Sequence, residues 1–107
     1  MSLLNQKTIK KQVSFSGIGL HSGIRVNICV KPSAPDTGIV FKRIDLAKNN
    51  LIKANFANVS SAKLCTTLKN NYDVKVSTVE HLLAALYLAD IDNAIIEIDN
   101  SEVPIMD

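Results

Sequence analysis

The sequence is poor in the residues that mark several specialised classes of protein. It has two cysteines, no tryptophan, and only three phenylalanines and two tyrosines in 107 positions. Cys29 and Cys65 are too few for a disulfide scaffold and form no paired metal motif. No apolar run approaches the ~20 residues that span a bilayer, and residues 1–11 lack the apolar centre of a signal peptide. These absences predict a soluble, cytoplasmic chain, and its length has room for one domain.

Charge is unevenly distributed along the chain. Residues 1–75 contain all 12 lysines and arginines but only Asp36, Asp45 and Asp73 as acids, whereas residues 76–107 contain seven acids and no basic residue. Such a division is typical of an anion-binding face, or of two halves that neutralise each other after folding. The first interpretation gives one candidate function: a non-catalytic α+β module that binds an anionic partner through its basic N-terminal two-thirds.

Alternating apolar and polar residues predict strands. The clearest case is Ile24, Val26, Ile28 and Val30, and three of the four glycines precede it at positions 17–23, which predicts a hairpin with a long glycine-rich connection. In residues 94–99, an apolar Ile95 on the second face predicts a central strand. The complete set of expected strands is 8–15, 24–31, 39–44, 51–54, 64–68 and 94–99.

One segment, residues 78–89, predicts a helix. Val79, Leu83 and Leu86 recur at helical spacing, and Ser77 followed by Glu80 has the pattern of a capping box. Several strands and one strong helix predict an α+β fold, with a mostly antiparallel sheet layered with helix. One helix is little cover for so many strands, so we expect an apolar sheet face that is covered by a partner, by self-association of the chain, or by sequence outside these residues.

The residues that could carry chemistry are few. The zincin, Walker and dinucleotide-binding motifs are absent. The adjacent Glu80 and His81 could supply a general base and a metal ligand at the start of the helix. They could also be only a capping residue and a surface histidine, and His21 only a solvated loop residue. The residues themselves leave these alternatives open.

Five ordered blocks carry a more specific signal. They are 14–23 (SFSGIGLHSG), 35–41 (PDTGIVF), 64–68 (LCTTL), 78–86 (TVEHLLAAL), and 92–94 together with 102–107 (DNA, EVPIMD). In order and spacing they resemble the N-terminal part of the UDP-3-O-acyl-N-acetylglucosamine deacetylase family. The resemblance implies zinc-dependent hydrolysis of the acetamide of a UDP-linked, acylated glucosamine in lipid A biosynthesis. It also implies two similar α+β domains with the active site between them.

Matched residue by residue, the resemblance gives roles to four positions. Glu80 resembles the general base, His81 resembles one of three protein zinc ligands, and Leu64 and Cys65 match a segment that lines the substrate site. His21 lies in a matching loop and receives no role.

The resemblance also implies that much of the enzyme lies outside this sequence. The other zinc ligands belong to the second domain of the family, which is absent, and the second helix of the first domain is missing. We therefore expect residues 1–107 to be a truncated N-terminal domain that is inactive alone and binds zinc weakly, because one histidine cannot hold the metal. We expect no nucleic-acid partner and no transmembrane segment. Acyl-chain preference would depend on the absent half.

Overall fold

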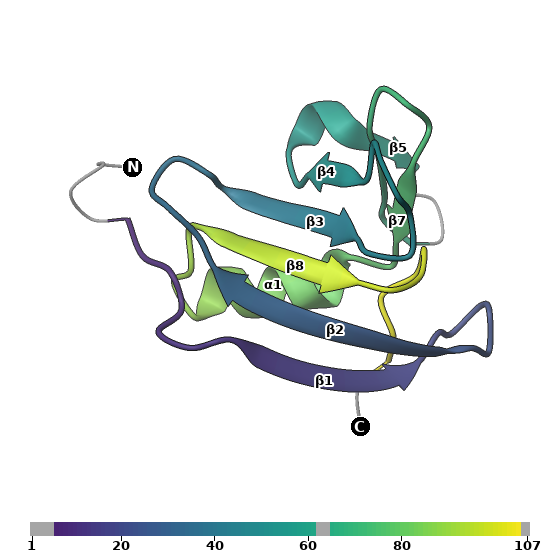
Figure 1. The fold of residues 1–107 in the computed structure, drawn as a ribbon, viewed down its shortest axis with the longest axis horizontal. Helices are drawn as coiled ribbons and strands as arrows, with labels where there is room; N and C mark the ends of the chain where they lie inside the picture. Colours follow the sequence, from purple (N-terminus) through teal and green to yellow (C-terminus); the bar gives the residue numbers. More distant parts are fainter. Residues whose placement is uncertain (1–5, 62–64, 106–107) are drawn as a thin grey trace.

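A computed structural model describes residues 6–61 and 65–105 of the chain. These residues form two β-sheets and one α-helix, α1 (Glu80–Leu88), and α1 lies behind the larger sheet (Figure 1). The arrangement confirms the predicted α+β class. Within the described residues, no helix is long and apolar enough to cross a membrane.

The larger sheet has five strands with the spatial order β1-β2-β8-β3-β4. Neighbouring strands run antiparallel except β3 and β8, which pair in parallel. β8 is the middle strand, which confirms the prediction drawn from Ile95. The strands are β1 (Val13–Ile18), β2 (Arg25–Pro32), β3 (Ile39–Arg43), β4 (Leu51–Lys53) and β8 (Ala94–Ile98).

The smaller sheet is inserted in the chain between β4 and α1. It contains three antiparallel strands in the order β5-β6-β7, and a short 3-10 helix precedes it. The elements are η2 (Phe56–Asn58), β5 (Val59–Ser61), β6 (Thr67–Lys69) and β7 (Lys75–Ser77). This sheet matters for function because its last strand leads directly into α1.

The core lies between the larger sheet and α1, and it extends to the smaller sheet. The inward residues of β2 and β8 are in register, with Ile28 opposite Ile98 and Val30 opposite Ile96. On the helix, Leu82 and Leu86 are buried against the same cluster. Side chains from the second sheet, Leu68 and Val76, join it as well. One continuous core therefore fixes the start of α1 against both sheets.

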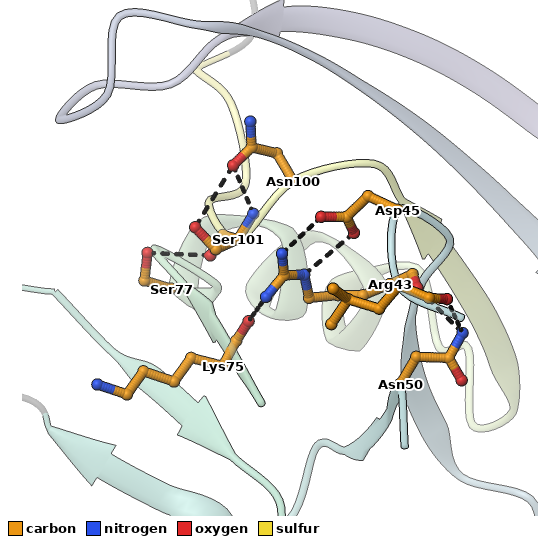
Figure 2. Close-up of polar contacts among 8 residues, drawn as sticks. Arg43, Asp45, Asn50, Lys75, Ser77, Asn100 and Ser101 are labelled. Carbon is orange, nitrogen blue, oxygen red and sulfur yellow. Dashed lines mark hydrogen bonds and ion pairs between the residues drawn. The ribbon is translucent and has the colours of Figure 1, made fainter. Parts of the chain in front are cut away.

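A polar contact also joins the two sheets (Figure 2). The Arg43 guanidinium pairs with the Asp45 carboxylate, with Nη2 2.6 Å from Oδ2, and its Nη1 donates to the Lys75 backbone carbonyl at 3.3 Å. In the same loop, Asn50 Nδ2 donates to the Arg43 carbonyl at 3.0 Å. The end of β3 is thereby tied to the first residue of β7.

The face of the larger sheet that points away from α1 is mainly polar. Arg25, Asn27, Lys31 and Glu97 lie on it, and Lys31 Nζ is 3.1 Å from Glu97 Oε1. On the inner face, Val13 of β1 is 54% exposed, so α1 does not cover this edge of the sheet completely. Self-association through an uncovered face stays a prediction.

Several local predictions are wrong. The strand expected at 64–68 is displaced to Thr67–Lys69, and the helix expected from residue 78 begins at Glu80, because Thr78 has a left-handed φ. The first strand does not begin at Thr8, because the Thr8 hydroxyl donates to the Asn93 carbonyl and β1 starts later, at Val13. Ile24 precedes β2 and is 53% exposed, since it belongs to the turn of the hairpin. The capping box does not form: Ser77 ends β7, its hydroxyl donates to the Ser101 carbonyl, and the N-cap position of α1 is Val79, with no capping side-chain hydrogen bond among the described residues.

Candidate active site

The chain changes direction sharply between β7 and α1. Thr78 has a φ of +60°, which is the left-handed region that a β-branched residue rarely adopts. Its side chain is buried, and Val79 behind it is fully buried. Such a conformation persists only where the surroundings hold it in place. After this turn and Val79, the helix begins with Glu80 and His81.

The carboxylate of Glu80 points toward the segment that precedes β6. Its Oε1 accepts a hydrogen bond from the backbone N–H of Thr66 at 3.1 Å, and the residue is half-buried. The contact joins residues 14 positions apart in the chain. It gives the Glu80 side chain a fixed direction, which a general base requires.

His81 is exposed on the first turn of α1. Its side chain lines a pocket of about 400 Å³ between the helix, β1 and the segment that follows β8. The remaining lining is mostly apolar: Phe15, Thr78, Leu82, Ala85, Val103, Pro104 and Ile105. The imidazole is therefore accessible at a concave surface, as expected of a metal ligand and equally compatible with a surface histidine.

Of the two predicted substrate-lining residues, the structure describes only Cys65. Leu64 lies outside the described residues. Cys65 is a half-buried free thiol next to Thr66, whose N–H contacts Glu80. The structure thus brings the Cys65 segment to Glu80, while the pocket beside His81 is lined by other residues. The site roles of all four residues stay predictions.

A buried carboxylate that the sequence analysis did not single out lies close to this turn. Glu102 is 3% exposed, and it accepts hydrogen bonds from the backbone N–H of His21 at 2.9 Å and of Ser22 at 3.0 Å. Its Oε2 also accepts a bond from the Thr78 hydroxyl at 3.4 Å and lies 4.0 Å from His21 Nε2. In the sequence, Glu102 is the first residue of the block EVPIMD, where it precedes the apolar run Val103-Pro104-Ile105.

These contacts decide the charge of Glu102. Burial by itself raises the pKa of a carboxyl, but the hydrogen bonds from His21 and Ser22, together with the nearby His21 imidazole, outweigh it and hold the pKa of Glu102 below its usual 4.5. The carboxylate is therefore ionised at neutral pH. It is an anionic anchor for the glycine-rich loop.

Part of the charge asymmetry of the sequence is neutralised by ion pairs at the surface of the fold. Lys7 Nζ lies 2.9 Å from Asp90 Oδ2, and Lys31 pairs with Glu97. The hydrogen bond to Asp90 and the charge of that carboxylate raise the pKa of Lys7. Both pairs join the basic part of the chain to the acidic part.

Metal ligands are sparse in this part of the chain. Across residues 6–61 and 65–105, no three His, Cys, Asp or Glu side chains gather where they could hold a metal ion together. His81 offers one imidazole, and Glu80 is its neighbour in sequence.

Fold and site define an α+β domain that presents a neighbouring carboxylate and imidazole at the start of its helix. The sequence profile of the family described as UDP-3-O-acyl N-acetylglycosamine deacetylase, LpxC, matches residues 6–107. The chain therefore belongs to this family. The match confirms the resemblance carried by the five blocks.

Individual relatives agree with this assignment. Proteins named UDP-3-O-acyl-N-acetylglucosamine deacetylase from Idiomarina loihiensis, Colwellia psychrerythraea and Shewanella frigidimarina are 48%, 49% and 47% identical to the chain over 105 residues. Each alignment covers 98% of this chain and 34% of the relative. The chain thus spans about a third of the length of these curated relatives.

Proposed function

We propose that this chain forms the first part of an enzyme that hydrolyses the acetamide of UDP-3-O-acyl-N-acetylglucosamine and releases acetate, a step of lipid A biosynthesis in the cytoplasm. One observation carries the proposal. Glu80, which is oriented by the Thr66 N–H, is followed directly in the sequence by an exposed His81 that lines a pocket. Family membership and the names of the relatives support the same reaction.

We further propose that the enzyme depends on zinc and that His81 is one of its protein ligands. An exposed imidazole fits one position of a zinc site, and catalytic zinc is held by three protein ligands with one position open. The other two ligands would come from the part of the family sequence that this chain does not span. When bound, zinc lowers the pKa of water toward ~7 and polarises a carbonyl group.

Glu80 would act as the general base. Its Oε1 accepts the hydrogen bond from the Thr66 N–H, which orients the side chain, and the described residues place no hydrogen bond on Oε2. Oε2 can therefore take a proton from the attacking water. The water oxygen bonds to the acetamide carbon, the C–N bond breaks, and the amine leaves with a proton while acetate is released. A carboxylate in this role contributes ~10²–10⁴-fold to the rate.

Cys65 and Leu64 would contact the substrate near the scissile bond. The support for Cys65 is its position next to Thr66, the hydrogen-bond partner of Glu80. The 107-residue chain alone would be inactive and bind zinc weakly, because it offers only part of the ligand set.

The test uses the full-length enzyme that carries this sequence. Acetate release and bound zinc would be measured for the wild type and for Glu80→Gln, His81→Ala and Glu97→Gln. We expect Glu80→Gln to lower kcat by at least ~100-fold and retain zinc, and His81→Ala to lose both zinc and activity. Glu97→Gln changes an outward carboxylate of β8 and is the matched control. If Glu80→Gln released acetate as fast as the wild type, the proposal would be overturned.

A further inference from the structure

We propose that Glu102 is a positioning residue, which holds the glycine-rich loop and, through Thr78, the start of α1 in the geometry that directs Glu80 and His81. The inference rests on the proposed function for its catalytic consequence. Its structural part stands on the contacts of the carboxylate.

Glu102 is the point where three separate parts of the chain meet. Its two oxygens receive the backbone N–H groups of His21 and Ser22 from the loop and the Thr78 hydroxyl from the helix start. A carboxylate this deeply buried is tolerated only when its oxygens are hydrogen-bonded. Its position is therefore determined from both sides, by the loop and by the helix start.

The backbone around Glu102 reinforces the connection. Ser77 N donates to the Ser101 carbonyl at 2.8 Å, and Val103 N donates to the Ser77 carbonyl at 2.9 Å. Two residues further on, Ile105 N donates to the Ile18 carbonyl at 3.0 Å. The segment that carries Glu102 thus joins the last residue of β7 to the last residue of β1.

The loop is fitted closely against the carboxylate. A Cβ atom at Gly19 would collide with Glu102 Oε1 and with the Ser22 hydroxyl. A larger residue at this position would have to displace the ends of the Glu102 and Ser22 side chains, so the loop backbone at Gly19 packs directly on the carboxylate.

Thr78 connects Glu102 to the candidate active site. It holds a left-handed φ of +60°, precedes Glu80 by two residues and lines the same pocket as His81. Loss of its bond to Glu102 would remove one of the contacts that hold this unfavourable conformation. The first turn of α1 would then sample other directions, and Glu80 and His81 would move with it.

The experiment compares Glu102→Gln with Glu97→Gln in the full-length enzyme. Glutamine preserves the shape of the side chain but removes the charge that receives two N–H donors. We expect kcat per folded molecule to fall by about 10- to 100-fold with KM little changed, and the His21 and Ser22 amides to exchange hydrogen faster. A kcat equal to that of Glu97→Gln would overturn the positioning role and leave the proposed function standing.

A second experiment tests whether Glu102 acts on the site through the Thr78 hydroxyl. Thr78→Val removes the hydroxyl, whereas Thr78→Ser keeps it. We expect kcat to fall with valine and to be largely retained with serine. We also expect Glu102→Gln to have a much smaller effect in the Thr78→Val background than in the wild type. Additive effects would overturn the route through Thr78. If the wild-type enzyme released no acetate, the proposed function would fail, and the amide exchange of His21 and Ser22 would still test the contact.

Discussion

The guanidinium of Arg43, at the end of β3, donates a hydrogen bond to the backbone carbonyl of Lys75, at the beginning of β7, at 3.3 Å (Figure 2). This contact spans 32 positions of the chain and joins the two sheets. Because β7 leads into the turn at Thr78, the placement of the site depends on how the smaller sheet is held against the larger one.

Replacing Arg43 should weaken that attachment. Arg43→Lys keeps the charge but loses the planar fork that binds Asp45 and the Lys75 carbonyl together. We expect a loss of about 1 kcal/mol in the free energy of unfolding for lysine and about 2 kcal/mol for alanine, measured by urea denaturation of the chain. Arg25→Lys is the control, since Arg25 is exposed and donates only to the Ser16 hydroxyl among the described residues. Equal stabilities of the Arg43 and Arg25 variants would contradict the expectation.

The ionised state of Glu102 predicts how stability depends on pH. Its pKa in the folded protein lies below the unfolded value of 4.5, so the folded state favours the carboxylate. The resulting stabilisation is fully present above pH 4.5 and is lost as the pH falls through the lower folded pKa. Unfolding free energies of the wild type and Glu102→Gln, measured from pH 7 to pH 3, should therefore differ most above pH 4.5 and converge below it. A difference in unfolding free energy that increases as the pH falls would contradict this prediction.

Two glycines of the loop should respond differently to alanine. At Gly19 a Cβ meets Glu102 and Ser22, so Gly19→Ala should destabilise the chain by about 2–3 kcal/mol through overpacking. At Gly23 no atom lies near the Cβ, but φ is +69°, and Gly23→Ala should cost about 1 kcal/mol for the left-handed backbone. Thermal unfolding of both variants measures the difference, and the reverse order would refute the close packing of Gly19 against Glu102.

Strands with sustained alternation could be predicted from the sequence. Residues 24–31 and 94–99 contain β2 and β8 almost completely, because one face of each is buried over the whole length. The short strands β5 and β7 were not predicted, since three residues are too few to show a period of two. Their strand geometry comes from pairing with β6, which is information from outside each segment.

The candidate site was also predictable only in part, because a sequence motif identifies residues that are close together in the chain and not their distant partners. Glu80 and His81 are neighbours in sequence, so a local motif can identify them. The partners that orient Glu80 and the loop are not local: Thr66 lies 14 positions from Glu80, and Glu102 lies 81 positions from His21. The capping pattern of Ser77 and Glu80 failed because Thr66 and Ser101 supply the partners of these two side chains instead. Tertiary contacts override a local preference wherever they offer better partners.

The central position of β8 in the larger sheet has a consequence during synthesis. β8 lies between β2 and β3, yet it is the last strand of the described chain to leave the ribosome. Until it emerges, the facing edges of β2 and β3 have no partner, and such edges invite pairing with other nascent chains. We therefore expect the larger sheet to close late and at its centre, when β8 pairs with β2 and β3.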